Sequence, residues 1–247
     1  MKQLAKKILQ AILGFDRYLF TFAVFKIKTF HWDKKESDFF HFLNLMEKTD
    51  HVLDVGSNIG VTSVLLSQHL KQGKVYSFEP LPPNYKTLDK VVSYYQCPNV
   101  EVFKFAVGDE NKEVEMVLPE VNNVKMQGLS HVVHKDLTEF NDGGRFTTEL
   151  KRLDGLEVLQ SVKIKGIKLD VENFEYFALR GAEAILKRDR PIVYTELWEN
   201  DNRGKCFAYM QSLGYSIQVQ VGGELVNYLP EKHDTQNFFL MPGKTDG

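Results

Sequence analysis

The chain has 247 residues, of which 43% are hydrophobic and 26% charged, a composition typical of a folded globular protein with a substantial core. Its formal net charge of −2 provides no overall attraction to nucleic acid or to an acidic surface, so no nucleic-acid partner is expected. The two cysteines, Cys97 and Cys206, lie far apart in the sequence and form no metal-ligand pair. A reducing location, the cytoplasm, is therefore the simplest expectation.

Residues 1–48 are expected to form an N-terminal helical segment. The first helix carries one apolar stripe and several lysines: Leu4, Ile8, Ala11 and Ile12, with Lys2, Lys6 and Lys7. Charged residues interrupt the apolar run, which is shorter than the roughly 20 residues of a spanning helix, and no signal-peptide cleavage site follows. Two interpretations stay open. The helix packs on the main domain or on a second subunit of a homodimer, or it rests on a membrane surface as a peripheral contact.

From residue 49 to residue 247, apolar strands alternate with helical patterns, which predicts one α/β domain with a Rossmann-like, mostly parallel sheet. The expected strands are residues 52–55, 74–78, 100–106, 162–172 and 191–197. The expected helices are residues 61–70, 83–95, 174–188 and 203–213. Residues 215–221 and 237–242 are expected to close the sheet as an antiparallel C-terminal edge.

The alternation breaks after the third expected strand. Residues 112–119, "KEVEMVLP", have the composition of a strand, but residues 119–147 are polar, contain glycines and show no clean period. We expect a loop insertion near 119–147 that serves as a functional loop or lid. A further strand follows near residue 147, and Asp154 is expected to cap the helix after it.

The most informative residues follow the expected strands, because ligands of open parallel sheets bind beyond the carboxyl ends of the strands. The first strand leads through Asp54 into a glycine turn, the second ends on Glu79, and Asp109 follows the third. A carboxylate after the second strand can accept both hydroxyls of a ribose, and an acid after the third can meet an adenine amine. The candidate cofactor-binding residues are Asp54, Gly56, Ser57, Asn58, Gly60, Glu79, Pro80 and Asp109.

The turn has the pattern D-x-G-x-N-x-G rather than the G-x-G-x-x-G that places two phosphates at a helix N-terminus. A carboxylate beside the turn repels phosphate but attracts an ammonium group. This favours S-adenosylmethionine, an adenosine with an amino-acid tail, as the cofactor. A nicotinamide-dependent oxidoreductase that uses Glu79 for its ribose stays as the alternative, as does a non-catalytic partner protein with the same fold.

Four ordered blocks between residues 43 and 242 resemble FkbM-type S-adenosylmethionine-dependent methyltransferases: "LDVGSNIG", "VYSFEP", "FAVGD", and "IKLDVENFEYFALRGAEAIL" followed by "PIVYTE". The resemblance implies a class I methyltransferase fold. It also implies that Asp54, Gly56, Asn58 and Glu79 bind S-adenosylmethionine and that Asp109 lies near its adenine. Family members mostly O-methylate hydroxyls of natural products or of sugars in surface glycans. This chain has Asn173 where the family usually has glycine, and asparagine tolerates left-handed backbone better than most residues.

Methyl transfer to a neutral hydroxyl benefits from a base, or from a metal that lowers the hydroxyl pKa. The candidate catalytic residues are Asp170, Glu172, Glu196 and His131. Asp170 ranks first; its alternative role is to orient Lys168 or the turn. Glu172 serves equally well as a cap of the following helix.

Other candidates are weaker. Glu196 is a candidate partner of Asp170 around a divalent ion, but no dedicated ligand spacing supports a metal site. Ser130, His131 and His134 in "MQGLSHVVH" are either contacts of the acceptor or incidental surface residues. The acceptor is expected to be a small molecule or a glycan.

Overall fold

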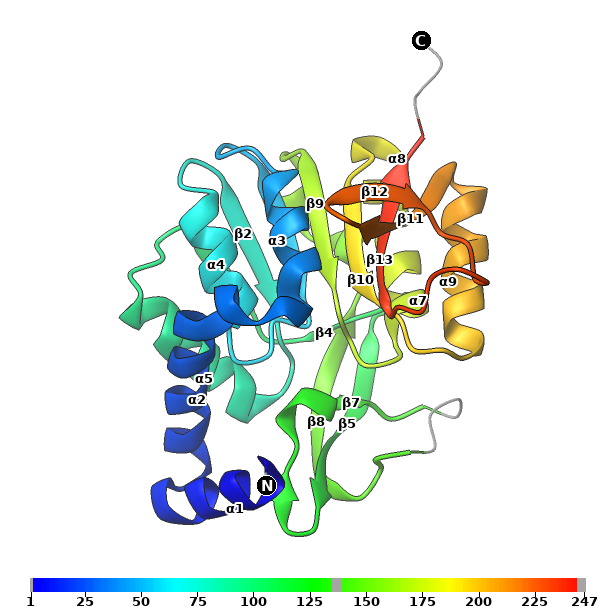
Figure 1. The fold of residues 1–247 in the computed structure, drawn as a ribbon. Helices are drawn as coiled ribbons and strands as arrows, with labels where there is room; N and C mark the ends of the chain where they lie inside the picture. The colour runs from blue at the N-terminus through cyan, green and yellow to red at the C-terminus, as the bar shows by residue number, and fades with distance from the viewer. Residues whose placement is uncertain (1, 135–138, 244–247) are drawn as a thin grey trace.

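The computed structural model describes residues 2–134 and 139–243 (Figure 1). Its centre is an eight-stranded sheet in the order β12-β11-β13-β10-β9-β1-β2-β3. The strands are β1 (His51–Val55), β2 (Lys74–Phe78), β3 (Val100–Phe103), β9 (Ile164–Leu169), β10 (Ile192–Glu196), β11 (Tyr215–Val221), β12 (Glu224–Asn227) and β13 (Asn237–Pro242). The strands from β10 to β3 run parallel, whereas β13 is antiparallel to both β10 and β11. The predicted fold class is confirmed.

β1 and β2 were predictable because almost all of their residues are buried and each reads as a short, mainly apolar run. The prediction for residues 100–106 was wrong in one respect. β3 ends at Phe103, and β4 (Ala106–Val107) belongs to a second sheet, where it pairs with β8 (Gly143–Lys151). The apolar run continues through the change of sheet, so the sequence gives no sign of it.

Helices connect the parallel strands. They are α4 (Val61–His69), α5 (Pro82–Tyr94), α6 (Glu157–Gln160), α7 (Glu175–Arg180), α8 (Glu183–Asp189) and α9 (Asp201–Ser212). The single helix expected over residues 174–188 is two helices, interrupted where Gly181 passes so close to Gly108 that a Cβ would lie 1.9 Å from its carbonyl oxygen. Asp154 caps α8, accepting from the backbone N–H groups of Ala184 (3.0 Å) and Ile185 (3.2 Å), and not the helix that follows it.

The insertion is a second, smaller sheet rather than an irregular loop. β5 (Lys112–Val121) pairs with β8 over most of its length, and with β6 (Val124–Lys125) and β7 (His131–Val132). Pairing between strands more than twenty residues apart leaves no local period, which is why residues 119–147 did not read as strands. Residues 135–138 of the expected insertion lie outside the described residues.

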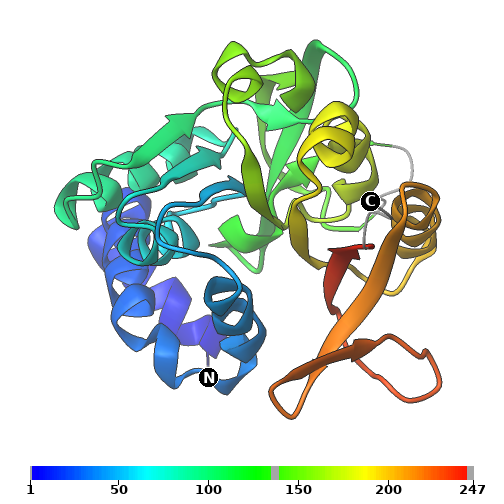
Figure 2. The same ribbon diagram turned by 90° about the horizontal axis from the view of Figure 1, so that it is seen from above.

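The N-terminal segment forms α1 (Lys2–Leu13), α2 (Phe15–Thr29) and α3 (Ser37–Asn44). Leu19 and Ala23 of α2 pack in one cluster with Val64 of α4 and Val91 of α5. Phe42 of α3 stacks on Tyr194 of β10, with ring centroids 5.7 Å apart. Figures 1 and 2 show α2 and α3 against the large sheet and its helices, and α1 at the periphery beside the small sheet. Within the described ranges, no helix is both long and apolar enough to cross a bilayer.

Candidate active site

The turn after β1 is in direct backbone contact with the end of β9. Gly56 has φ +80° and lies so close to the carbonyl of Asp170 that a Cβ would stand 1.7 Å from that oxygen. The N–H groups of Gly56 and Ser57 both donate to the carbonyl of Phe78 at the end of β2, at 3.0 Å. Glycine is therefore required at residue 56, and this contact holds together the segments that carry the candidate cofactor-binding and catalytic residues.

Glu79 closes β2 and is almost fully buried. Its Oε2 accepts from the N–H of Asn58 (2.9 Å), and its Oε1 accepts from the N–H of Leu81 (3.0 Å) and the Nδ2 of Asn84 (3.2 Å). Burial outweighs these bonds and raises the pKa of Glu79 to about 7. The carboxylate thus ties the glycine turn to the start of α5.

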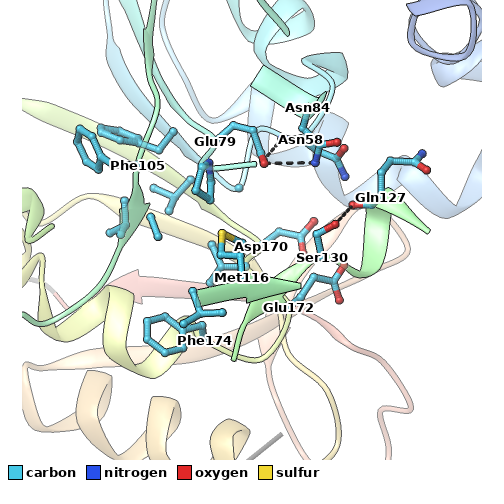
Figure 3. Close-up of a pocket in the computed structure, with 18 of the residues that line it drawn as sticks. Asn58, Glu79, Asn84, Phe105, Met116, Gln127, Ser130, Asp170, Glu172 and Phe174 are labelled. Carbon is cyan, nitrogen blue, oxygen red and sulfur yellow. Dashed lines mark hydrogen bonds between the residues drawn. The ribbon is translucent and has the colours of Figure 1, made fainter. Parts of the chain in front are cut away.

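A narrow cleft runs beside Glu79 (Figure 3). One wall is formed by the mainly polar residues Asn58, Glu79, Pro80 and Asn84. The apolar lining includes Phe105, Met116 and Phe174. The opposite side is completed by Gln127, Ser130, Asp170 and Glu172. Figure 3 shows Glu79 and Asn58 across the cleft from Met116 and Glu172.

Three amide oxygens of the cleft are buried without a hydrogen-bond partner: Asn58 Oδ1, Asn84 Oδ1 and Gln127 Oε1. Such groups are costly unless a ligand supplies donors, so the cleft suits a molecule with several hydroxyl or amino groups. Sequence reasoning missed Asn84 and Gln127. The signals were present, since Asn84 opens the helix after Glu79 and Gln127 begins the polar stretch that drew attention to Ser130.

Asp54, by contrast, does not line the cleft. It is fully buried and accepts from the hydroxyls of Thr62 (2.9 Å) and Ser63 (2.6 Å) at the start of α4. Asp54 is also paired in register with Lys168 on β9, whose Nζ lies 3.8 Å from its Oδ1. Ser57 donates to the Asp54 carbonyl (2.6 Å), and Gly60, with φ +86°, is the N-cap of α4. Asp54, Ser57 and Gly60 thus stabilise the conformation of the glycine turn and do not line the cleft.

Asp109 and His131 also lie outside the described residues that line the cleft. Asp109 forms an ion pair with Arg180, at 3.3 Å. The buried His131 ring contacts the carbonyl of Leu129 (2.8 Å) and the Oδ1 of Asn141 (3.2 Å). The part of the cleft beside β4, where Asp109 was expected, is lined by the apolar Phe105, Ala106 and Val107.

A second, much larger cavity of about 1040 Å³ adjoins the cleft. Its walls come from the N-terminal helices, the small sheet, the strand ends and the loop before β13, including Lys6, Phe22, Lys26, Phe39, Met126, Ser57, Lys168, Tyr194, Glu196, Glu199, Arg203 and Asn237. The cleft and the cavity share Gly56, Asn58, Gln127, Gly128 and Asp170. Molecules bound in the two spaces would therefore meet at Asp170.

Lys168 organises the charges at this junction. Its Nζ donates to the carbonyl of Gly56 (3.0 Å) and lies 3.4 Å from Oδ2 of Asp170. Burial opposes protonation of Lys168, but the carboxylates of Asp170 and Asp54 outweigh it and raise its pKa. Lys168 thus links the carboxylate of Asp170 to the backbone of the glycine turn.

Two further carboxyl groups face Asp170. Burial, together with the charges of Asp170 and Glu196, raises the pKa of Glu172. Glu196, at the end of β10, is partly enclosed by the cavity walls, and this desolvation and the Asp170 charge raise its pKa to about 7. Among the described residues, no group of three or more histidine, cysteine, aspartate or glutamate side chains is arranged to hold a metal ion.

The segment after Asp170 makes a left-handed turn, with φ 53° at Glu172 and 72° at Asn173. Asparagine does support the conformation here, and its Oδ1 also accepts from Nδ2 of Asn200, at 2.8 Å. No side chain caps α7. Instead Glu175 reaches back, and its Oε1 accepts from the N–H groups of Val171 (3.1 Å) and Asn173 (3.2 Å). Glu172 is thereby left facing the cleft.

Comparison with known proteins agrees with this architecture. The family model described as the methyltransferase FkbM domain matches residues 54–232. "Methyltransferase 1" of Beauveria bassiana is 22% identical over 147 residues, which cover 53% of this chain and 58% of that protein. The crystal structure of methyltransferase FkbM from Methylobacillus flagellatus superimposes with a TM-score of 0.54 at 18% identity, covering 78% of this chain and 44% of that one.

A putative rRNA methylase from Clostridium thermocellum shares the fold, with a TM-score of 0.50 at 8% identity, covering 83% of this chain and 91% of that one. The chain thus spans little more than half of the fungal relative and less than half of the crystallised FkbM protein. The family match, in contrast, extends over most of the chain, from the acid of the glycine turn to the loop before β13. The chain therefore belongs to the FkbM methyltransferase domain family.

Proposed function

We propose that this protein is an S-adenosylmethionine-dependent O-methyltransferase that acts on a hydroxyl of a saccharide, in a surface glycan or a natural product. One observation carries the proposal: the carboxylate of Asp170 lines both the narrow cleft and the large cavity. A donor in the cleft and an acceptor in the cavity would come together at a single acidic side chain. The two described cysteines are free and buried, which fits a cytoplasmic protein.

The cleft suits the proposed cofactor. Glu79, with the unpartnered oxygens of Asn58 and Asn84, would accept the ribose hydroxyls, and the apolar wall at Phe105 and Met116 would take the adenine. The unpartnered oxygen of Gln127, a residue that lines both the cleft and the cavity, would accept from the ligand ammonium. When bound, a sulfonium donor supplies an electrophilic methyl carbon. A nicotinamide dinucleotide fits less well, because the site brings carboxylates rather than helix N–H groups to the ligand.

The chain's own residues would orient the acceptor and take its proton. The acceptor oxygen must approach the methyl carbon in line, forming the new C–O bond as the C–S bond breaks. The hydroxyl proton passes to the carboxylate of Asp170, which Lys168 holds in place. Glu196, with a pKa near 7, stands on the cavity side and can relay that proton to solvent. Among the cavity walls, polar groups such as Glu199, Arg203 and Asn237 suit the hydroxyls of a sugar.

Two measurements test the proposal. Isothermal titration calorimetry with S-adenosylmethionine and with NAD should show binding of the first and not of the second; the reverse would identify an oxidoreductase. Mass spectrometry of surface polysaccharide and small metabolites from cells with and without the gene should then show the loss of one methyl group from a hydroxyl. Cofactor binding with no methylated product in any extract would instead indicate a non-catalytic partner protein.

A further inference from the structure

α1 is attached to the protein through its polar side. Lys6 and Gln10 face the body of the molecule, whereas the apolar side chains one turn apart on the other side are open to solvent. The exposed fractions are 63% for Leu4, 49% for Ile8, 46% for Leu9 and 74% for Ile12. We call these four residues the α1 apolar face. An amphipathic helix of a soluble protein normally packs the other way round.

The orientation of α1 is fixed by specific contacts. Gln10 donates through Nε2 to the carbonyl of Lys125 (3.1 Å) and accepts at Oε1 from its N–H (3.2 Å), so the helix is attached to β6 by a reciprocal pair. The ammonium of Lys125 also lies 4.9 Å from the ring centre of Phe15, at the start of α2. Gly14, with φ +74°, makes the bend between α1 and α2. The apolar face is therefore held outward.

We propose that the α1 apolar face docks on the surface of a membrane containing anionic phospholipids. The α1 segment contains no acidic residue, and Lys7 is exposed beside the apolar face, so this side of the helix matches a negatively charged surface in charge as well as in polarity. From this position Lys7 can reach lipid headgroups. At about 1.5 Å per residue, the twelve-residue helix offers a stripe about 18 Å long, enough to lie in the interface but not to cross it.

A second copy of the chain is the less favourable occupant. Two α1 apolar faces meeting across a two-fold axis would bring Lys7 of each copy close together, with no acidic residue on either helix to compensate the charge. An anionic membrane removes the same apolar surface from water and also neutralises Lys7. The docking also has a geometric consequence, because Lys6 lines the large cavity and the membrane would lie beside its wall. This inference goes beyond the proposed function and does not depend on it.

Vesicle flotation of the full-length protein tests the docking. The wild-type chain should float with vesicles of phosphatidylglycerol and phosphatidylcholine in equal parts and bind pure phosphatidylcholine much more weakly. The double variant Ile8→Glu/Ile12→Glu should lose at least a hundredfold in vesicle affinity. Lys7→Gln should lose about fivefold. The matched control is Leu229→Glu, which adds a charge at another exposed apolar residue, two positions after the end of β12, and should bind as wild type. Figure 1 shows β12 on the other side of the molecule from α1.

The results of these measurements distinguish a membrane from a second copy of the chain as the partner of the α1 apolar face. Circular dichroism melting of each variant shows that the fold is intact, since all substituted side chains are exposed. Equal flotation of the double variant, or no flotation of the wild type, would overturn the proposal. So would sedimentation of the lipid-free wild type as a dimer that the double variant converts to a monomer. In that case the face belongs to a second copy.

Discussion

The narrow cleft and the large cavity are built in different ways. The cleft has a volume of about 50 Å³ and the cavity about 1040 Å³. The polar wall of the cleft comes from the glycine turn, Glu79 and the first turn of α5, which are all parts of the parallel β/α core. The cavity, in contrast, is walled to a large extent by segments placed around that core, namely the N-terminal helices, the small sheet and the loop before β13. In the proposed function, the core would therefore supply the donor site, and the added segments would shape the acceptor site.

Asp170 lines both the cleft and the cavity, so its substitution tests whether this side chain serves cofactor binding or methyl transfer. We expect Asp170→Asn to slow methyl transfer by about 100-fold or more, because the amide cannot take the hydroxyl proton. The affinity for S-adenosylmethionine should change little, and calorimetry together with single-turnover kinetics measures both. Full activity with weakened cofactor binding would place Asp170 with the cleft alone and move the base to another residue.

Glu175 holds the left-handed turn that follows Asp170, and its ionisation makes the stability of this part of the cleft depend on pH. Burial raises its pKa to about 7 from the ordinary value of 4.5. A raised carboxyl pKa means that the folded state binds more protons, so its stabilising contribution is complete below pH 4.5 and is lost as the pH rises through 7. We expect Glu175→Gln to remove this loss, a change of about 3 kcal/mol in the pH dependence of unfolding.

Urea unfolding of wild type and Glu175→Gln at several pH values measures that difference. The comparison between the two proteins cancels the titration of Glu79 and Glu196, which also have raised pKa values. Parallel stability curves between pH 4.5 and 7 would show that Glu175 is ionised at an ordinary pKa.

Glu79 lines the cleft and does not line the large cavity, so its substitution should affect only the donor. We expect Glu79→Ala to weaken S-adenosylmethionine binding more than tenfold, because charge-assisted hydrogen bonds to the ribose are lost. Glu79→Gln is the matched control, since it keeps the side-chain shape and one acceptor, and it should bind with intermediate affinity. Calorimetric affinities equal to wild type in both variants would rule out the assigned role of Glu79.

The smallest effect is expected at Asn173, in the left-handed turn beside the cleft. Asn173→Gly relieves the left-handed φ of 72° but loses the hydrogen bond from Asn200, so stability should change by less than about 1 kcal/mol. Asn173→Ala loses the bond and keeps the strain, and should cost about 1–2 kcal/mol. Thermal unfolding measures both. Equal stability of the two variants would show that backbone strain is unimportant here.

The sequence predicted the core better than its surroundings for a physical reason. The boundaries of β1, β2 and α4 followed from short apolar runs, glycines and prolines, which are local signals. Glu79 and Asp170 were located for the same reason, since each directly follows a buried strand. The small sheet depends on pairing between β5 and β8, which are distant in the chain, and so it was interpreted as a loop.

The site residues show the same limit. His131 was selected because its imidazole can accept a proton. The pairing of β7 with β5 buries this side chain, and its Nδ1 lies at hydrogen-bond distance from the carbonyl of Leu129. Asp109 follows its strand as expected, but its carboxylate forms an ion pair with Arg180 at the end of α7 instead of lining the cleft. Asn84 and Gln127 were missed because an amide becomes notable only when its oxygen is seen to lack a partner. The direction of the side chain, rather than the position in the sequence, decides that Asn84 and Gln127 line the cleft and that His131 and Asp109 do not.

The place of β13 in the large sheet affects how the chain emerges during synthesis. β13 lies between β10 and β11, although it follows both in the sequence. A nascent chain that has released everything through β12 therefore still exposes one unpaired edge of β10 and one of β11, and such edges recruit other chains. Residues 237–242 must therefore be synthesised before β10 and β11 can be joined in one continuous sheet.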